Sequence, residues 1–368
     1  MANEDKASRY HRLQRRASIA GTVLGALTLL VVLVTGVSAD IRDTAASIAG
    51  SASAVATALY VLALVLLAEI LQLPLSFYQG VVLERRYGLS TQTTARWWVD
   101  QIKGFGVSLV FAVIAGEIVW ALLRSSPQYW WLLAAAIFTL ILVVLAQLAP
   151  VLLLPLFYRF TPLDRPVLAE RLIALATRAG TRVVGVFEWR LSDRTRKANA
   201  ALTGIGATRR ILLSDTLLAE HSDDEIEVIL AHELAHHVHH DIWSGLALET
   251  VLILVGFYAA DRIMSAFSAS FGLQGKTDIA ALPLLVLVAG GVSLLLLPLV
   301  NAFSRSHERR ADRYALEMTR NVAAFISAMK RLGTQNLAEE HPSRVVQWLF
   351  YSHPPMRERI AAAEDARS

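Results

Sequence analysis

Residues 129–157 read YWWLLAAAIFTLILVVLAQLAPVLLLPLF, an apolar run that contains no charged side chain. A helix needs about 20 mainly apolar residues to cross the hydrocarbon core of a bilayer, and this run is long enough. Five other stretches have the same character: 17–39, 55–75, 105–123, 246–260 and 279–300. The stretch 246–260 is the shortest of them. The pattern predicts a mainly α-helical integral membrane protein with six or seven transmembrane helices, of which six is the number that we favour.

The composition of the chain agrees with burial in lipid. Of its 368 residues, 55% are hydrophobic and 18% are charged, whereas soluble proteins average about 45–50% apolar and about 25% charged residues. The net charge is only +4, and the basic residues cluster at the ends of the apolar stretches, which is typical of membrane anchoring rather than of nucleic-acid binding. Cysteine is absent, so disulfides, cysteine-ligated zinc and a cysteine nucleophile are excluded.

The first apolar stretch admits a second interpretation, a cleaved signal peptide. Arginines precede it, and Val37-Ser38-Ala39 at its end resembles a cleavage site. Its apolar run exceeds the roughly 7–15 residues of a signal peptide, so we favour an uncleaved membrane anchor.

Lysine and arginine residues near the ends of the spans predict the orientation, because cytoplasmic loops are enriched in them. Basic residues are frequent before the first span, after the second and after the fourth. The loops after the first and third spans carry a single arginine each, Arg42 and Arg124. We therefore expect both termini and segment 158–243 in the cytoplasm. The preference for arginine over lysine indicates a bacterial source, and hence the inner membrane.

The chain divides into four predicted parts. Residues 1–157 are expected to form an N-terminal bundle of four spans, and residues 158–243 a cytoplasmic α+β catalytic insertion. Residues 244–303 are expected to form a transmembrane hairpin, and residues 304–368 a C-terminal catalytic segment. Within the insertion, the pattern predicts a helix over 164–179, strands over 183–189 and 209–213, and a connection over 203–207.

A metal-binding motif lies near the end of the insertion, where Ala231-His232-Glu233-Leu234-Ala235-His236 follows Ser222-Asp223-Asp224-Glu225. The serine and glutamate of the second stretch form a capping box, which marks a helix N-terminus. Residues four apart share a helix face, so His232 and His236 can bind one zinc ion together. Glu233 lies beside them and can take a proton from a zinc-bound water that attacks a carbonyl group. This HExxH motif predicts one Zn²⁺ per chain and a hydrolytic reaction.

A catalytic zinc site has three protein ligands, so another ligand must come from elsewhere in the chain. Glu249 is one candidate, but it lies on an apolar span. Glu308 is the candidate that we favour, because it follows the span that returns the chain to the membrane face of His232. Asp312, one helical turn further on, can accept a hydrogen bond from a ligand histidine. A charged helix face beside the membrane is the alternative explanation of both acidic residues. The nearby histidines are interpreted as a solvated helix end: His237, His239 and His240.

Polar residues also occur within the spans, at Glu69, Gln72, Glu117, Gln147 and Glu249. Ionisable groups are costly in lipid and usually face a bundle interior or a watery cavity. The residues alone leave two interpretations open, hydrogen bonds between helices and a hydrated chamber inside the bundle.

Further motifs are spread over most of the chain. They are ERRYGLS at 84–90, KANA at 197–200, the stretch SRSHERRAD at 304–312, and SHPP at 352–355 with Arg359. Together with the HExxH helix, they resemble the loop, substrate-strand, zinc and C-terminal motifs of the type I CAAX prenyl endopeptidases, which are integral-membrane gluzincin metalloproteases. The zinc motif by itself is common to many peptidases, whereas the combination is highly specific.

This resemblance implies roles for individual residues. Glu308 would be the third zinc ligand. Asn199 and Ala200 would lie on an edge strand that binds an extended substrate by backbone pairing. His353 and Arg359 would stabilise the oxyanion or the substrate. The family also implies a hydrated chamber between the spans, although its members commonly have seven spans and a longer region before the zinc helix.

The sequence thus predicts a membrane-embedded zinc metalloendopeptidase similar to the CAAX prenyl proteases. Its expected partners are the lipid bilayer and a peptide or protein substrate, prenylated or membrane-associated, with no nucleic acid. A membrane-protein quality-control metalloprotease of the heat-shock type is the alternative. Charged residues flanking the zinc motif argue against an intramembrane site-2 protease. Glu233 argues against a transporter or scaffold, because a structural zinc site needs no general base.

Overall fold

A computed structural model describes residues 5–204 and 208–366 of the chain. In this part, six helices are long and apolar enough to cross a membrane: Lys6–Val34, Ser53–Arg86, Thr94–Ser125, Trp130–Phe157, Asp241–Phe271 and Ile279–Thr319. Large apolar side chains point outward from them, and Ile70, Leu140 and Leu295 are 64%, 64% and 78% exposed. Exposing such apolar surfaces to water is unfavourable, whereas lipid chains solvate them. The prediction of six spans is confirmed.

The membrane part contains, in chain order, α1 (Lys6–Val34), α2 (Val37–Ala49), α3 (Ser53–Phe77), a π-helical turn (Tyr78–Leu83), α4 (Glu84–Arg86), α5 (Thr94–Ser125), α6 (Trp130–Leu152), α7 (Leu154–Phe157), α11 (Asp241–Phe267) and α12 (Leu282–Thr319). The polar part contains β1 (Phe160–Pro162), α8 (Pro166–Arg178), β2 (Gly185–Trp189), β3 (Ala200–Thr203), β4 (Arg210–Ser214), α9 (Asp215–Glu220), α10 (Asp223–Val238), α13 (Val322–Gln335), α14 (Arg344–Phe350) and α15 (Met356–Asp365).

The helix boundaries differ from the predicted spans in three places. The stretch 17–39 is not one helix, because the chain turns at Gly36, whose φ of 81° suits glycine, and α2 begins directly after it. The short span 246–260 belongs to the much longer α11, whose ends are polar. Finally, α12 continues well past residue 300 and carries the chain from the last span into the polar part.

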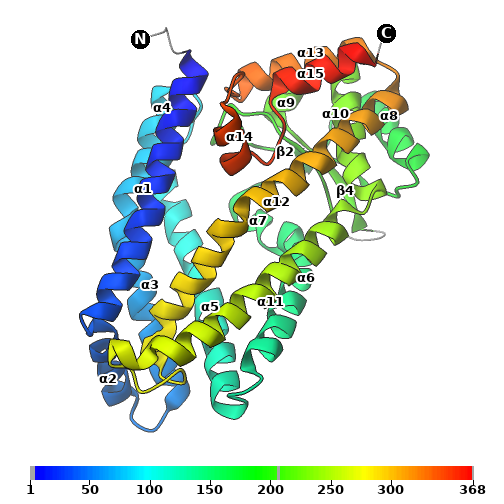
Figure 1. The fold of residues 1–368 in the computed structure, drawn as a ribbon. Coiled ribbons are helices and arrows are strands. Elements are labelled where there is room, and N and C mark those ends of the chain that lie inside the picture. The colour runs from blue at the N-terminus through cyan, green and yellow to red at the C-terminus, as the bar shows by residue number, and fades with distance from the viewer. Residues whose placement is uncertain (1–4, 205–207, 367–368) are drawn as a thin grey trace.

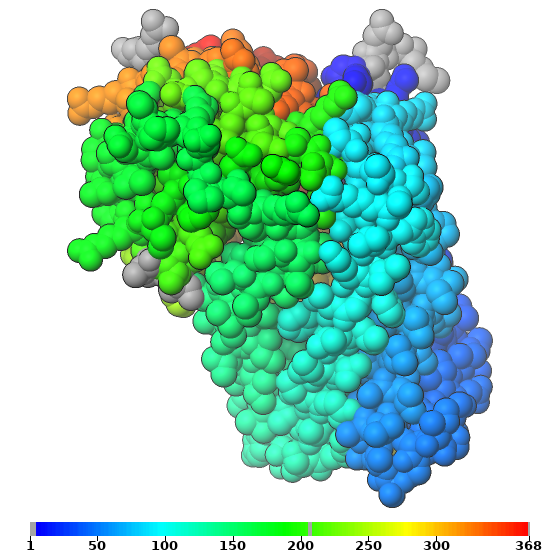
Figure 2. Space-filling view, turned by 180° about the vertical axis from the view of Figure 1, so that it is seen from behind, coloured from blue at the N-terminus to red at the C-terminus, as the bar shows by residue number. Residues whose placement is uncertain are grey.

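The long helices form a column with the polar part at one end. Figure 1 shows the sheet, α8, α10, α13 and α15 gathered at this end, together with both ends of the described chain, whereas α2 and the turn between α11 and α12 lie at the other end. Figure 2 shows the molecule from behind, with the segment around the sheet (green) beside the upper end of the column of α3, α5 and α6 (blue to teal).

A four-stranded sheet in the order β1-β2-β4-β3 lies in the insertion. The central strands β2 and β4 are parallel, and the outer strands β1 and β3 are antiparallel to their neighbours. The predicted strands 183–189 and 209–213 correspond to β2 and β4. The pattern of residues missed β1 because it has only three residues. Part of the predicted connection, 205–207, lies outside the described residues.

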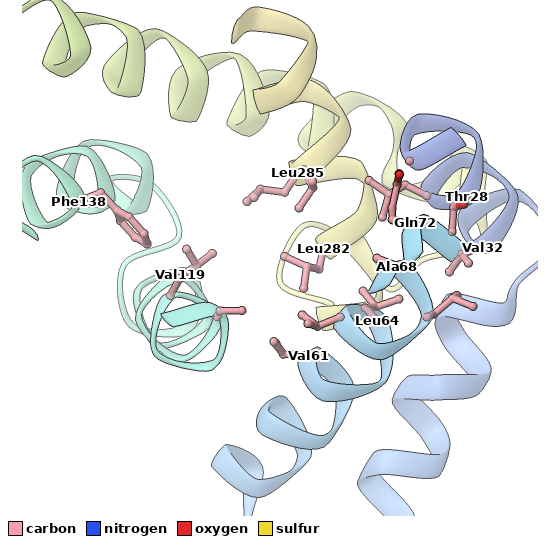
Figure 3. Close-up of a pocket in the computed structure, with 18 of the residues that line it drawn as sticks. Thr28, Val32, Val61, Leu64, Ala68, Gln72, Val119, Phe138, Leu282 and Leu285 are labelled. Atoms are coloured by element: carbon pink, nitrogen blue, oxygen red, sulfur yellow. The ribbon is translucent and has the colours of Figure 1, made fainter. Parts of the chain in front are cut away.

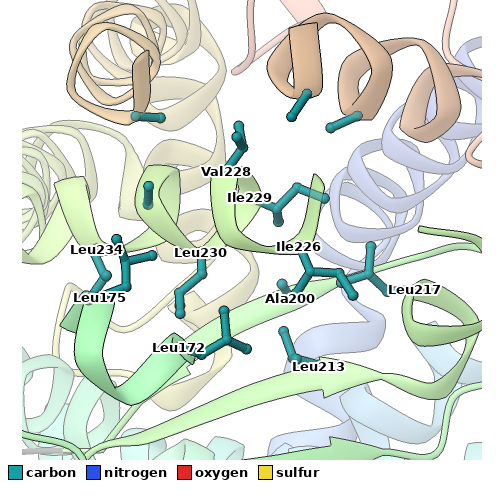
Figure 4. Close-up of a cluster of buried hydrophobic side chains, with 14 of the residues drawn as sticks. Leu172, Leu175, Ala200, Leu213, Leu217, Ile226, Val228, Ile229, Leu230 and Leu234 are labelled. Atoms are coloured by element: carbon teal, nitrogen blue, oxygen red, sulfur yellow. The ribbon is translucent and has the colours of Figure 1, made fainter. Parts of the chain in front are cut away.

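The core of the polar part fixes α10 against the sheet. Leu172 and Leu175 of α8, Leu213 of β4, and Ile226 and Leu230 of α10 contact one another and are fully buried (Figure 4). Complete burial of such a side chain contributes about 1.5–3 kcal/mol relative to leaving it exposed. Phe325 of α13 is fully buried in the same cluster, so α13 also packs against α10.

A cavity of about 380 Å³ lies between the spans, with side chains of α1, α3, α5 and α12 in its wall (Figure 3). Most of the lining side chains are apolar; Gln72 and Thr28 are polar, and Gln72 Nε2 donates to Gly21 O at 2.7 Å. Its wall includes neither Glu69 nor Glu117. This is therefore an apolar cavity, whereas a hydrated chamber would have polar walls. Gln72 instead fits the other interpretation, a hydrogen bond between helices.

Candidate metal centre

The helix that carries the HExxH motif begins as the sequence predicts. Ser222 Oγ accepts a hydrogen bond from Glu225 N at 3.3 Å, and Glu225 Oε2 accepts one from Ser222 N at 2.7 Å. The acidic first turn suits the positive end of the helix dipole. From there α10 continues to Val238, so His232 and His236 share a face, and their ring centroids are 5.0 Å apart.

The long helix α12 brings Glu308 to this pair of histidines. His232 Nε2 lies 3.3 Å from Glu308 Oε2, and His236 Nε2 lies 3.5 Å from Glu308 Oε1. One potential ligand atom from each of these three residues lies within 4.8 Å of the other two. We refer to His232, His236 and Glu308 as the metal group. Glu249, the competing candidate, is exposed on α11 and is not in this group. The three histidines interpreted as a solvated helix end also lie outside the group: His237, His239 and His240.

The Nδ1 atoms of His232 and His236 each face a buried carboxylate. His232 Nδ1 lies 2.9 Å from Asp312 Oδ1, and His236 Nδ1 lies 2.9 Å from Asp241 Oδ2. Such partners fix the orientation of a ring and leave its other nitrogen for the metal. The sequence predicted a contact of this kind for Asp312. It missed Asp241, whose only signal is an acidic residue just after the motif helix, and which the sequence interpretation treated as a flanking charge.

Two arginines hold these carboxylates in place. Arg359 donates from Nε to Asp312 Oδ2 at 2.8 Å and from Nη2 to Asp312 Oδ1 at 2.6 Å. Arg310 donates to Asp241. Arg359 is only 8% exposed, so its charge needs a buried partner, and Asp312 is that partner. The guanidinium group thus binds Asp312 on the Nδ1 side of His232, and the Arg359 side chain also lines the cavity over the metal group.

The buried carboxylate of Glu308 indicates that the metal group can hold a cation. Glu308 is 5% exposed, and its buried Oε2 makes no hydrogen bond within the described residues. Two imidazole nitrogens lie near this oxygen without hydrogen-bond geometry, His353 Nδ1 at 2.8 Å and His232 Nε2 at 3.3 Å. A buried acceptor without a donor is costly, and a cation between the three residues removes that cost. Two imidazole nitrogens and one carboxylate are also the donor set of catalytic zinc sites with an open fourth position.

A cavity of about 390 Å³ lies over the metal group. Its lining includes most of the residues that the sequence and the resemblance singled out: Asn199, Ala200, His232, Glu233, Glu308, His353 and Arg359. Burial raises the pKa of the Glu233 carboxyl above its usual range, and the neighbouring charges of His232 and His236 oppose this shift. The candidate general base therefore lies beside the metal group, in an environment where its carboxylate is poorly solvated.

Other residues at this cavity carry no signal in the sequence. His11 comes from α1, while Asn336, Glu339 and Tyr351 come from the segment after α13. His11 Nε2 lies 2.9 Å from Leu337 O, and Arg15 donates to Glu339 at 2.5 Å. The first membrane helix thus contacts the C-terminal segment next to the metal group. More than 300 residues separate the two in the sequence, so only the fold brings them together.

Two family models match the chain in succession. The CAAX prenyl protease N-terminal model, with five membrane helices, matches residues 2–159, and the peptidase family M48 model matches residues 162–367. The chain belongs to peptidase family M48. Membership of M48 makes it a metalloendopeptidase, and the apolar helices make it a multi-pass integral membrane protein. The resemblance seen in the sequence is confirmed. Four candidate spans and the short α2 lie in the region matched by the first model.

Individual M48 relatives resemble almost the whole chain. The "Uncharacterized metalloprotease YhfN" of Bacillus subtilis is 33% identical over 97% of this chain and 84% of its own. The CAAX prenyl protease 1 of Saccharomyces cerevisiae is 30% identical over 98% of this chain and 85% of its own. The crystal structure of S. mikatae Ste24p superimposes with a TM-score of 0.88, covering 98% of this chain and 88% of that chain at 23% identity. The last comparison confirms the fold.

Proposed function

We propose that this M48 protein is a zinc endopeptidase in which His232, His236 and Glu308 hold one Zn²⁺. The observation that supports this most directly is the convergence of their ligand atoms within 4.8 Å, with the remaining ring nitrogens held by Asp312 and Asp241. Zinc content after purification tests the metal, and cleavage of a peptide that a chelator abolishes and zinc restores tests the reaction. Full activity of metal-free protein would contradict the proposal.

The neighbouring side chains then have distinct tasks in peptide hydrolysis. A bound zinc ion lowers the pKa of water and polarises a carbonyl oxygen. Glu233 accepts the proton of the attacking water at its carboxylate and returns it to the leaving amine. His353 is exposed next to Glu308 and donates a hydrogen bond to the developing oxyanion. Arg359 acts through Asp312, which it holds against His232.

The substrate is bound as an extra strand on the sheet. The edge strand β3, with Asn199 directly before it, lies next to the metal group, and Ala200 lines the same cavity as Glu233. An extended peptide at such an edge gains main-chain hydrogen bonds whatever its side chains are. The yeast relative named CAAX prenyl protease 1 supports a prenylated or otherwise membrane-associated substrate. Cleavage of a prenylated peptide but not of an unfolded membrane protein would support this substrate, and the reverse would indicate quality control.

The polar part and both termini are proposed to face the cytoplasm, in a bacterial inner membrane, with the four-part division at residues 157, 243 and 303. The basic loops support this orientation. Ala95 and Ser125 are exposed near the two ends of α5, and the chain contains no cysteine. In intact cells, an impermeant thiol reagent should label Ser125→Cys and spare Ala95→Cys. The opposite labelling would invert the proposed topology.

A further inference from the structure

The strand β3 has two different sides. It pairs with β4 in the register Ala200 opposite Leu213, and just before it Asn199 O accepts from Ser214 N at 2.9 Å while Asn199 N donates to Ser214 Oγ at 2.9 Å. Peptide groups of successive strand residues point to opposite sides in an antiparallel pair. Because Asn199 bonds toward β4, the N–H and C=O groups of Ala198 and Ala200 point away from β4.

At Ala198 this outer edge is occupied by the side chain of Asn336. Ala198 N donates to Asn336 Oδ1 at 2.8 Å, and Asn336 Nδ2 donates to Ala198 O at 3.2 Å. A carboxamide has the same donor and acceptor as a peptide group. Asn336 therefore pairs with Ala198 as one residue of a neighbouring strand would, next to the position where a bound peptide would pair with Ala200.

The end of α13 holds Asn336 in this position. Asn336 N donates to Leu332 O at 2.9 Å, and Ala338 N donates to Gly333 O at 2.8 Å. Between them, Leu337 has a φ of 54°, a conformation that costs a residue with a side chain roughly 1–2 kcal/mol. Gln335 Nε2 also donates to Arg196 O and Thr216 O at 3.1 Å each. The C-terminal end of α13 is thus hydrogen-bonded to Arg196, Ala198 and Thr216.

We propose that Asn336 closes the peptide-binding edge of β3 at Ala198 and so limits the number of substrate residues beyond the scissile bond. The inference rests on the proposed binding of substrate as an added strand. Ala198, Ala200 and Asn336 line one cavity with Glu233 and Glu308, so the closed end of the edge lies close to the reacting atoms. Asn336 is a specificity residue here, without a part in the chemistry.

The direction of the added strand decides which end of the substrate is limited. Antiparallel pairing is the more stable arrangement, and an antiparallel strand on β3 would place its C-terminal part beside Ala198. A substrate with a short C-terminal tail after the scissile bond then fits the open edge. A longer tail has to leave the sheet or displace the two hydrogen bonds of Asn336, which predicts a loss of roughly ten- to thirtyfold in kcat/KM.

The test uses peptides with one cleavage site and a constant N-terminal part, extended stepwise on the C-terminal side. For the wild-type enzyme, kcat/KM should fall by roughly ten- to thirtyfold once the tail passes the closed edge. Asn336→Ala should reduce the ratio between short and long peptides to near one. Thr334→Ala is the matched control, because the exposed Thr334 hydroxyl donates to Lys330 O within α13 and its removal leaves the pair between Asn336 and Ala198. It should keep the wild-type ratio.

A second variant and a binding assay make the result independent of folding and of turnover. Asn336→Asp keeps the acceptor for Ala198 N but places an oxygen against Ala198 O, so it should also lose the length ratio. The same ratios should appear in peptide binding when Glu233 is replaced by glutamine. Equal ratios in wild type and both Asn336 variants would overturn the inference, and a dependence on N-terminal length would overturn the strand direction. If the wild type neither binds nor cleaves any of the peptides, the proposed function itself fails.

Discussion

Removing Asp312 should affect the protein in two separable ways. The carboxylate lies 2.9 Å from His232 Nδ1 and accepts two hydrogen bonds from the buried Arg359, at 2.8 and 2.6 Å. In Asp312→Ala the arginine charge is left buried without a partner, which costs about 3–5 kcal/mol of stability. The ring of His232 also loses the group that orients it, which lowers metal affinity or activity by roughly 10–100-fold.

The double variant Asp312→Leu with Arg359→Met separates these two effects. It removes the buried charge together with its partner, and replacing a buried pair by apolar residues is often neutral or stabilising. We therefore expect its melting temperature in detergent to return to near the wild-type value, while zinc affinity, measured by competition with a chelating dye, stays as low as in Asp312→Ala. Recovery of zinc affinity along with stability would refute the proposed role of Asp312 in orienting His232.

Three further predictions concern the same site. Glu308→Ala should be purified with little zinc and be inactive, while Glu249→Ala should contain normal zinc by elemental analysis; the reverse result would exchange the two ligand assignments. Glu233→Gln should retain zinc, because both histidines remain, and lose turnover; unchanged peptide cleavage would contradict a general base at this position. Leu230→Ala should destabilise the polar part by about 2–5 kcal/mol, which thermal unfolding in detergent measures; an unchanged transition would show that α10 is not held by this core.

The spans were predictable because hydropathy is summed over many residues. A long apolar stretch such as 129–157 has no alternative burial in a chain of this size. Hydropathy does not detect a change of backbone direction, so the turn at Gly36 and the start of α2 were missed. Averaged hydropathy also gave too short a span at 246–260, because it does not count the polar residues near the ends of α11 as part of the helix.

The candidate site divides in the same way into local and distant parts. His232, Glu233 and His236 are defined by the geometry of one helix, and the capping box shows where that helix begins. Glu308 could be proposed from the return of the last span, but residues alone left Glu249 as a rival. Asn336 acts through Ala198, which is 138 residues away in the sequence, and no spacing rule finds such a residue. Asp241 is only five residues from His236, but the sequence does not show that its carboxylate faces the His236 ring.

Helix α12 runs from the last span to the metal group and contains Pro298 on the way, so the length of this one helix sets how far Glu308 lies from the start of that span. Glu308 lies 26 residues beyond Leu282, the first residue of α12, or about 39 Å along the helix axis at 1.5 Å per residue. Inserting one residue before Glu308 would rotate its carboxylate by about 100° away from the histidines. Inserting two whole turns would restore its direction but move it outward by about 10 Å. For a membrane-anchored substrate of the kind proposed above, the segment between anchor and scissile bond therefore has to be long enough to reach Glu308.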